Sequence, residues 1–556
     1  MNKTKKLTVI SLIGTLLCAS AFAQNKKRVN IDHTDKMQHN KQIVANANRL
    51  IGHVKITHED IVMFCDSAYS YNDTNMVDAF GSVHIIKADT LHMYAHFVNY
   101  NGDTQWAIAE RNVRLVNKQT TLTTDVLNYD MNANIGYYDD YGTLVDSTNV
   151  LHSRVGEYYA NSDKAYFKKE VDGQTPDYRM LSDTLIYSPS TGITTIVGPT
   201  TCYNENDTLY ASEGFYDTQN KYAELHNYPV VKTEKQLIKA KSIFLDQNTS
   251  DGIAIDNASI QDYDQKIIIK GNRIKYNDQK QVSLVTDSAH ALLYSNIDTL
   301  YMHADTLHTF PDTIPNQKIV LGYYGVQFFR EDLQGKCDST AYFSADSTLR
   351  LYHEPLVWSQ SNQLSADYME MLINDSIHQE FHLEKNSFII SQEDSIKYNQ
   401  IKGRDMIGYI INKQLKRINV DGNGQSIYYA YDSKGLIGLN KAMGSKIGIN
   451  LEQSRVSKIT FYTNPDGQLI PPFMIGDQDR ILAGFKWQDL IRPKSIYDIF
   501  LTPEQKSDTT YRMQVEEKIK SYKELPIQYK IEDYPKPKRE SFTKPILIEE
   551  KTEEVE

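Results

Sequence analysis

The sequence predicts an all-β protein with an elongated, repetitive fold of short antiparallel strands. Three observations support this prediction. Apolar and polar residues alternate over short segments that Asn, Asp and Gly separate. One pair of strand motifs recurs over several hundred residues, as in proteins that stack repeats. The 38 tyrosines and 18 phenylalanines are residues that strands favour.

The repeating unit is clearest in residues 79–94, AFGSVHIIKADTLHMY. Val83 and Ile85 share one face of a first strand, and Leu91 and Met93 share one face of a second strand. An Asp-Thr-Leu step into a strand recurs at residues 89–91, 183–185, 207–209, 298–300 and 305–307, with a looser copy at 125–127. We interpret the Asp as a turn residue and the Leu as inward-facing. Because one hairpin is not stable alone, the copies are expected to stack their apolar faces.

The N-terminus indicates export. A basic start, an apolar run at 7–17 and an A-x-A site at 21–23 predict that residues 1–23 are a cleavable signal peptide. A lipoprotein signal ending at Cys18 is the rival interpretation, but the preceding Leu17 is not the small residue that such a site requires. We therefore expect a soluble exported protein.

The rest of the chain divides by composition. Thr502 can cap a helix whose first turn holds Pro503, and the chain beyond Pro526 is rich in Pro, Lys and Glu. In order, we expect a flexible lead-in over 24–42, the best-defined β repeats over 43–190, their continuation over 191–435, a C-terminal β segment over 436–500, a helix over 501–525 and a disordered charged tail over 526–556.

Charge and motifs exclude several functions. The formal net charge of -11 argues against a nucleic-acid partner. No apolar run of about 20 residues follows the signal, so no transmembrane helix is predicted. Common catalytic and nucleotide-binding motifs are missing, and turn chemistry accounts for the many aspartates. The 15 histidines are scattered, and solvated strand positions explain them, including His84, His92 and His303. Cys65, Cys202 and Cys337 are too widely spaced for a metal pair. We therefore predict neither an enzyme nor a cofactor.

The export signal, the G-x-V-x-I strand at 81–85 and the A-D-x-L-x-Y strand at 88–94 resemble the OstA-like family. This family includes the periplasmic lipopolysaccharide-transport protein LptA and the N-terminal domain of LptD. The long chain with Tyr- and Asn-rich strands resembles members of the Bacteroidetes type. The resemblance covers residues 28–190 best, and it implies a β-jelly roll with an open, V-shaped apolar groove. It also implies a periplasmic role in outer-membrane assembly.

In such a groove, lipopolysaccharide would travel with its acyl chains inside and its sugars outside. Other jelly-roll components, or copies of the chain itself, would join end to end by strand addition. Matched position by position, the groove-lining residues would be Val83, Ile85, Leu91, Met93, Val113, Leu115, Leu127, Tyr129, Leu185, Tyr187 and Leu209.

Periodicity alone does not separate a groove from a filled core, because both need alternate apolar residues. Two other functions therefore stay open at this point. One is a secreted β-helical enzyme that processes polysaccharide, which would need a cluster of acid and base groups on one face. The other is a purely structural exported repeat protein, whose core would be filled throughout.

Overall fold

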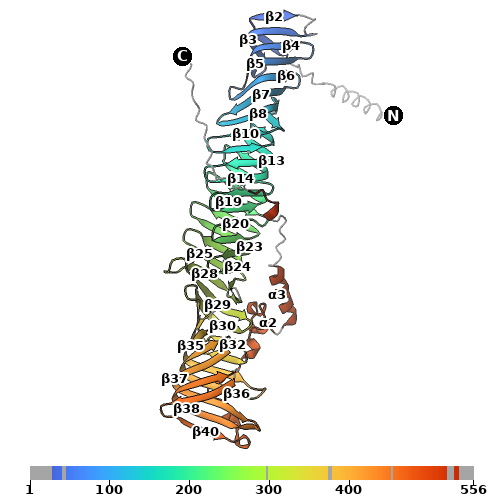
Figure 1. Ribbon diagram of the computed structural model, residues 1–556. Helices are drawn as coiled ribbons and strands as arrows, with labels where there is room; N and C mark the ends of the chain where they lie inside the picture. The colour runs from blue at the N-terminus through green and yellow to red at the C-terminus, as the bar shows by residue number, and fades with distance from the viewer. Residues whose placement is uncertain are drawn as a thin grey trace, which may run out of the picture. The chain divides into compact units, whose positions relative to one another are not determined.

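The computed structural model describes residues 28–39, 46–295, 298–373, 378–412, 414–452, 455–506, 508–521 and 531–536. The chain forms two compact units. Of the described residues, those up to Gly192 belong to unit 1, and those from Ile193 onwards belong to unit 2. Both units are built of antiparallel strands that follow one another in chain order, and short helices come near the C-terminus (Figure 1). The predicted all-β class with a short C-terminal helix is confirmed.

The strands of unit 1 begin close to the first described residue. They are β1 (Asn30–His33), β2 (Lys36–His39), β3 (Asn48–His58), β4 (Ile61–Tyr71), β5 (Met76–Lys87), β6 (Leu91–Asn101), β7 (Trp106–Asn117), β8 (Thr120–Asp130), β9 (Ile135–Tyr138), β10 (Gly142–Val145), β11 (Val150–Ser153), β12 (Val155–Tyr159), β13 (Lys164–Gln174) and β14 (Arg179–Ser188).

β1 and β2 lie inside the lead-in that was expected to be flexible. Both strands are mostly exposed and both pair with β3, so their polar sequences lack the apolar alternation by which strands are recognised. The signal peptide over 1–23 lies outside the described residues.

Each long strand of unit 1 bends at its centre. In β5, Phe80 pairs with Phe97 of β6 and Val83 pairs with Ala95, so two residues of β5 stand opposite one of β6. This arrangement is a β-bulge, which bends a strand. Gly81 has a φ of 85°, and the carboxylate of Asp66 occupies the place where a Cβ would lie. Asp66 also accepts a hydrogen bond from the Ser82 N–H, at 3.0 Å. We call this bend the corner.

Corners recur about every 30 residues, a spacing typical of stacked repeats. Left-handed residues mark them in unit 1 at Gly52, Gly81, Arg111, Tyr141 and Lys169. The corners divide unit 1 into two sheets that face each other. Wall A contains residues 54–65, 83–95, 113–124, 142–153 and 171–182, and wall B contains residues 67–80, 97–110, 126–138, 155–168 and 184–188.

The Asp-Thr-Leu motif occupies two different places in this geometry. Asp89 lies in the hairpin turn between β5 and β6, as predicted for a turn residue. Asp183 instead lies within β14, opposite the corner of β13. At the hairpin turn and at the corner alike, the chain changes direction and the Leu of the motif points inward. The same motif therefore occurs in both places.

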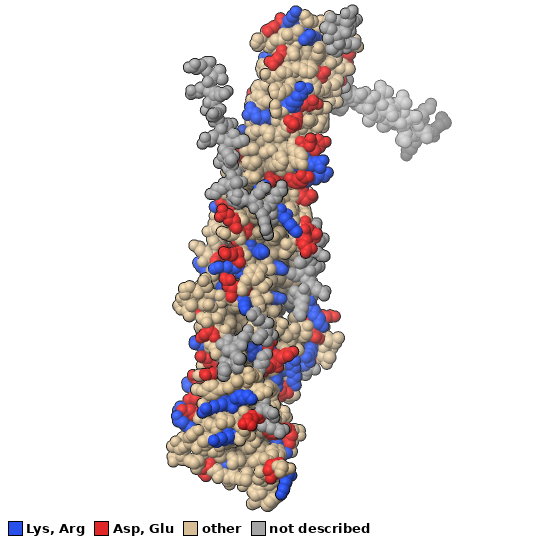
Figure 2. Space-filling view, in the orientation of Figure 1, with Lys and Arg blue, Asp and Glu red and all other residues tan. Residues whose placement is uncertain are grey.

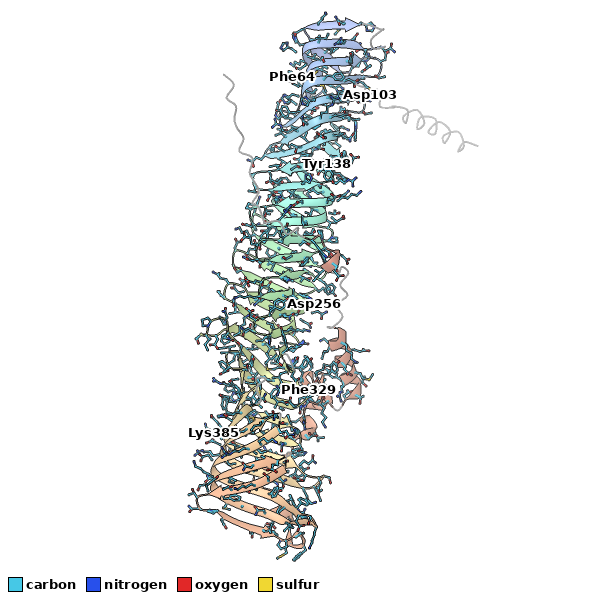
Figure 3. The ribbon with its side chains drawn as sticks, in the orientation of Figure 1. Phe64, Asp103, Tyr138, Asp256, Phe329 and Lys385 are labelled. Carbon is cyan, nitrogen blue, oxygen red and sulfur yellow. The ribbon has the colours of Figure 1, made fainter. Side chains whose placement is uncertain are left out.

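Unit 2 repeats the pattern with strands of more varied length, from 3 residues in β20 to 19 in β37. They are β15 (Ile193–Ile196), β16 (Thr200–Tyr203), β17 (Thr208–Ala211), β18 (Glu213–Asp217), β19 (Tyr222–His226), β20 (Val230–Lys232), β21 (Gln236–Lys239), β22 (Ser242–Asp246), β23 (Asp251–Asp262), β24 (Ile267–Asn277), β25 (Val282–Thr286), β26 (His290–Tyr294), β27 (Thr299–His303), β28 (Thr306–Pro311), β29 (Lys318–Arg330), β30 (Leu333–Phe343), β31 (Thr348–Tyr352), β32 (Leu356–Ser359), β33 (Asn362–Ser365), β34 (Tyr368–Leu372), β35 (His378–Gln392), β36 (Tyr398–Ile411), β37 (Gln414–Asp432), β38 (Gly435–Glu452), β39 (Arg455–Tyr462) and β40 (Asp466–Ile470). Asp256 and Lys385 mark two of its corners (Figure 3).

The strands end at Ile470, before the limit of 500 that was expected for the C-terminal β segment. Pro471 and Pro472 lack the N–H that a further ladder needs. Four short 3-10 turns follow, η1 (Pro472–Met474), η2 (Asp477–Asp479), η3 (Asp489–Ile491) and η4 (Asp498–Phe500). We call residues 471–501 the C-terminal strap.

Two helices lie in the range where one was expected, α2 (Pro503–Lys506) and α3 (Thr509–Ser521). A short turn, η5 (Ile531–Asp533), is the last described element, and residues 526–530 and 537–556 of the predicted tail lie outside the described residues. Within unit 2, α2 lies beside the strands near β29 and β30 (Figure 1). The turn η4 packs on β29, where Gln327 donates a hydrogen bond to the carbonyl of Leu501 at 2.8 Å.

Candidate functional site

The interior between the two walls of unit 1 contains ten of the eleven residues predicted to line a groove. All ten are buried, and the most accessible of them, Leu91, is 6% exposed. Ile85 pairs with Met93, and Met93 pairs with Leu115, so these side chains form a continuous row on wall A. Leu209 is the exception, because it lies in β17 of unit 2 and is half-buried.

The interior of unit 1 is filled by its own side chains in this conformation. Val83, Ile85, Leu115 and Leu127 are each at most 2% exposed. A side chain so little exposed contacts protein atoms on all sides. An acyl chain therefore reaches these residues only when the walls separate and part of the packing between them is exchanged for contacts with the lipid.

The walls meet again on the side opposite the corners. Hairpin turns at 59–60, 88–90 and 118–119 end wall A, and turns at 102–105, 131–134 and 160–163 end wall B. Across this gap the side-chain amide of Gln105 donates to the carboxylate of Glu59 at 3.0 Å. Figure 3 shows Asp103 in one of the wall B turns. We call the line between the two rows of turns the mouth.

Polar side chains bridge the mouth at regular intervals, and we call these bridges the rungs. His58 Nδ1 lies 2.6 Å from the hydroxyl of Tyr100. One repeat further, the Lys87 ammonium donates to the main-chain carbonyl of Met131. The third rung joins the Asn117 amide to the hydroxyl of Tyr158 at 2.9 Å.

A fourth rung follows at the next repeat. The amide of Asn149 donates to the hydroxyl of Tyr187 at 2.7 Å, and that hydroxyl also donates to the carboxylate of Asp146. Each rung thus joins a polar group from the end of wall A to the end of wall B. The rungs occupy the last inward positions before solvent, so they border the apolar interior along its open side.

The four tyrosines of the mouth are buried, and burial raises the pKa of Tyr100, Tyr129, Tyr158 and Tyr187 above the usual range. Their hydroxyls therefore stay protonated and can donate hydrogen bonds. The hydroxyl of Tyr129 is buried and has no hydrogen-bond partner among the described residues.

Sequence reasoning identified Tyr129 and Tyr187 as inward-facing but missed the rungs. The available signal was the spacing, since Tyr100, Tyr129, Tyr158 and Tyr187 each follow the last by 29 residues. Polar partners such as His58 and Lys87 gave no signal of their own, because a polar residue beside a turn is ordinary.

The outward face of wall A carries a polar aromatic stack rather than a site. His84 stacks on Tyr94 with ring centroids 4.3 Å apart, and His92 lies next to His84. The guanidinium of Arg114 lies over the Tyr94 ring at 4.5 Å. Lys and Arg are interspersed with Asp and Glu over the visible surface (Figure 2). The solvated strand position expected for His84 and His92 agrees with their partial exposure.

His303 differs from that expectation. Its ring is half-buried against Phe500 of η4, with centroids 4.7 Å apart, and His290 packs on the same phenyl ring at 5.2 Å. Burial lowers the pKa of His303, and it lowers the pKa of His290 to about 4. The strap that covers these rings is distant in sequence, so local pattern could not reveal it.

Buried glutamines hold the C-terminal strap on unit 2. Gln400 donates to the carbonyl of Arg480 at 2.6 Å and accepts from the N–H of Leu482 at 2.8 Å. Gln363 repeats this geometry with Lys486 and Gln488, at 2.7 and 2.8 Å.

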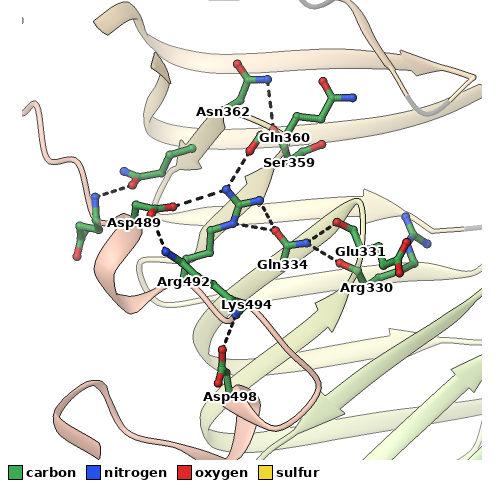
Figure 4. A network of polar contacts seen from close by, with 12 residues as sticks. Arg330, Glu331, Gln334, Ser359, Gln360, Asn362, Asp489, Arg492, Lys494 and Asp498 are labelled. Carbon is green, nitrogen blue, oxygen red and sulfur yellow. Dashed lines mark hydrogen bonds and ion pairs between the residues drawn. The ribbon is translucent and has the colours of Figure 1, made fainter. Parts of the chain in front are cut away.

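Gln334 receives the side chain of Arg492 instead. Both Nε and Nη2 of Arg492 donate to the Gln334 Oε1, and its Nη1 donates to the carbonyl of Gln360 (Figure 4). Beneath the strap, Leu482 packs against the outward side chains of Phe388, Ile390, Ile427, Tyr429 and Leu439.

A cavity of about 870 Å³ lies between the strap, α3 and the corners of unit 2. Asp305 and Asp338 line it, but both occupy the corner position that Asp66 occupies in unit 1, so the fold accounts for them. Among the described residues no three His, Cys, Asp or Glu side chains are grouped closely enough to hold a metal ion. Cys65, Cys202 and Cys337 are free thiols, and burial raises the pKa of each.

None of the helices that the structure describes has the length and apolar character needed to cross a membrane. The comparison with curated proteins gives no match to the sequence. The OstA-like protein family matches residues 26–183, a range that includes most of unit 1. This match, together with the two facing walls and their apolar interior, identifies residues 26–183 as an OstA-like region.

Proposed function

We propose that the protein is a non-catalytic periplasmic carrier that binds lipopolysaccharide and passes it towards the outer membrane. The continuous row of inward apolar side chains in the OstA-like region is the observation that carries this proposal. The acyl chains would lie between walls A and B against residues such as Ile85, Met93 and Leu115. The sugars would stay outside, beyond the mouth.

The energetics suit a carrier. Burial of one acyl chain of about twelve methylenes gains on the order of 10 kcal/mol, at roughly 0.8 kcal/mol per methylene. The filled interior offsets part of this gain, because the walls must first give up contacts with each other. Repeats that offer nearly equal sites let the lipid move from one to the next without becoming trapped.

The proposed location is the periplasm, because residues 1–23 are predicted to be a signal peptide for export. The strands β1 and β2 pair with β3 at the start of unit 1. We propose that another jelly-roll component, or a second copy of the chain, adds a strand to the edge of the sheet that β1 and β2 form.

Photocrosslinking in living cells tests the function. A small aliphatic diazirine amino acid at Met93 or Leu115 should capture lipopolysaccharide. The same probe at Val116 is the matched control, because Val116 follows Leu115 but faces outward and is half-buried. Capture of lipopolysaccharide at Val116 but not at Leu115 would contradict the proposal, and capture of soluble glycan at outward positions would favour a polysaccharide-processing enzyme.

A further inference from the structure

The rungs lie where the polar part of a bound lipid would lie. His58, Asn117 and Asn149 are each at most 5% exposed, and the tyrosines that they contact are equally buried. Buried polar groups need partners, and an apolar side chain at these positions would need none. In the closed interior the two walls supply these partners to each other.

The second rung is incomplete. The Lys87 side chain is buried, and no carboxylate of the described residues lies within ion-pair distance of it, so its partner is the Met131 carbonyl. Tyr129 precedes Met131 by two residues, and its buried hydroxyl has no partner. A buried ammonium and an unused hydroxyl donor together favour an anion with several acceptor oxygens.

We propose that the rungs form a headgroup site, and that Lys87 and Tyr129 bind a phosphate group of the lipid that unit 1 carries. This inference rests on the proposed carrier function and specifies the ligand as a lipid with a phosphorylated headgroup. Groups that bond across the mouth in the closed interior exchange those bonds for phosphate and sugar oxygens when acyl chains separate the walls.

The way in which the strands connect the two walls determines on which side the walls can separate. At the corners the walls are joined by continuous strands, as in β5, whose ladder with β6 runs on both sides of Gly81. At the mouth no strand continues from one wall to the other, and the polar contacts named among the described residues, the four rungs and the contact between Gln105 and Glu59, each use at least one side chain. The mouth therefore opens while the corners hold, and the lipid enters sideways past the rungs.

A binding measurement on the full chain without its signal peptide tests the phosphate site. The probes are bisphosphorylated lipid A and its dephosphorylated form with the same acyl chains. Replacement of Lys87→Met should weaken binding of the phosphorylated probe at least 10-fold and leave the dephosphorylated probe unchanged. Lys118→Met, an exposed lysine in the next turn of wall A, should change neither affinity.

Tyr129→Phe keeps the test decisive if Lys87→Met fails to fold, because it removes a hydroxyl that has no partner in the closed interior. It should weaken binding of the phosphorylated probe several-fold without loss of stability. Undiminished binding of phosphorylated lipid A to both variants would overturn the phosphate site. If a diazirine at Leu115 still captures the lipid in these variants, the carrier function stands and this inference alone fails.

A reversible bridge tests sideways entry. In a background with Cys65→Ala, Cys202→Ala and Cys337→Ala, Asn117→Cys and Tyr158→Cys are joined by a short bis-methanethiosulfonate, which forms a reducible disulfide with each thiol and releases methanesulfinate. The bridged protein should lose lipid A capture at Leu115, and reduction should restore it to the level of the same unbridged variant. Equal capture before and after reduction would show that the lipid does not pass the mouth.

Discussion

The outward faces of the strands distinguish unit 1 from unit 2. In unit 1 the outward side chains of wall A reach solvent, whether they are polar, such as His84 and Arg114, or apolar, such as Ile86, and the apolar inward side chains are buried. In unit 2 the outward side chains of Phe388, Ile390 and Tyr429 are buried as well, beneath the C-terminal strap. Where only the inward side chains are buried, a stack of hairpins is enough to bury them. Where the outward side chains are buried too, another segment of the chain must cover them, and in unit 2 this segment is the C-terminal strap.

The largest effect is expected from the interior of unit 1. Leu127 is fully buried, so Leu127→Ala should reduce the free energy of unfolding of unit 1 by about 2–5 kcal/mol. Hydrogen exchange should show faster exchange over β7 and β8, whereas strands of unit 2 such as β36 keep their protection. Unchanged exchange in β7 and β8 would mean that the two walls do not pack as described.

A lower pH should weaken the contact between the C-terminal strap and the strands of unit 2. Burial lowers the pKa of His290 from the ordinary 6.5 to about 4, with Lys270 and His303 adding positive charge nearby. The folded state thus disfavours the protonated ring, so its stability is complete above about pH 6.5 and falls by roughly 3 kcal/mol as the pH approaches 4.

Hydrogen exchange around Phe500, measured at pH 7.5 and pH 5, should show release of this contact at the lower pH. The variant His290→Asn, which does not titrate, should lose most of that difference. A pH response that is identical in the variant would assign the effect to other groups.

The glutamine contacts should have a smaller effect. Gln363→Ala leaves the carbonyl of Lys486 and the N–H of Gln488 without their partners, at a cost of about 1–3 kcal/mol. Proteolysis or hydrogen exchange at residues 480–488 should increase. Gln281→Ala, at an exposed turn of unit 2, is the matched control and should have no effect.

The smallest expected changes in stability come from removing single tyrosine hydroxyls at the mouth, and they should differ between Tyr158 and Tyr129. Tyr158→Phe removes a hydroxyl that binds Asn117 and Asp163, so it should cost about 1–2 kcal/mol. Tyr129→Phe removes a hydroxyl without a partner, so it should be neutral or slightly stabilising in the absence of lipid. Equal losses in thermal unfolding of the two variants would argue against the rungs as described.

Much of the fold of unit 1 could be predicted, because alternation and turn residues are local signals. Val83, Ile85 and Met93 point inward as their spacing predicts. The sequence did not distinguish the corner at Gly81 from a hairpin turn, because the same short motifs, such as Asp-Thr-Leu, occur at corners and at hairpin turns. Rung partners such as Lys87 and Met131 are 44 residues apart, and no local pattern joins them.

The strap of unit 2 escaped prediction for the same reason. Its apolar residues, such as Leu482 and Trp487, resemble a strand in sequence, but they pack in a cluster with strand residues between Phe388 and Leu439, which precede them by 43 to 99 residues. Tertiary contacts therefore decided the structure of residues 471–501.

The most direct test of the central claim compares two neighbouring isoleucines of β5. Ile85 is 1% exposed and faces the interior, whereas Ile86 faces outward and is half-buried. Purified protein with a diazirine amino acid at either position is loaded with lipopolysaccharide and irradiated, and the adducts are identified by mass spectrometry. The carrier account predicts acyl-chain adducts at Ile85 and none at Ile86. Adducts at Ile86 alone, or at neither position, would contradict it.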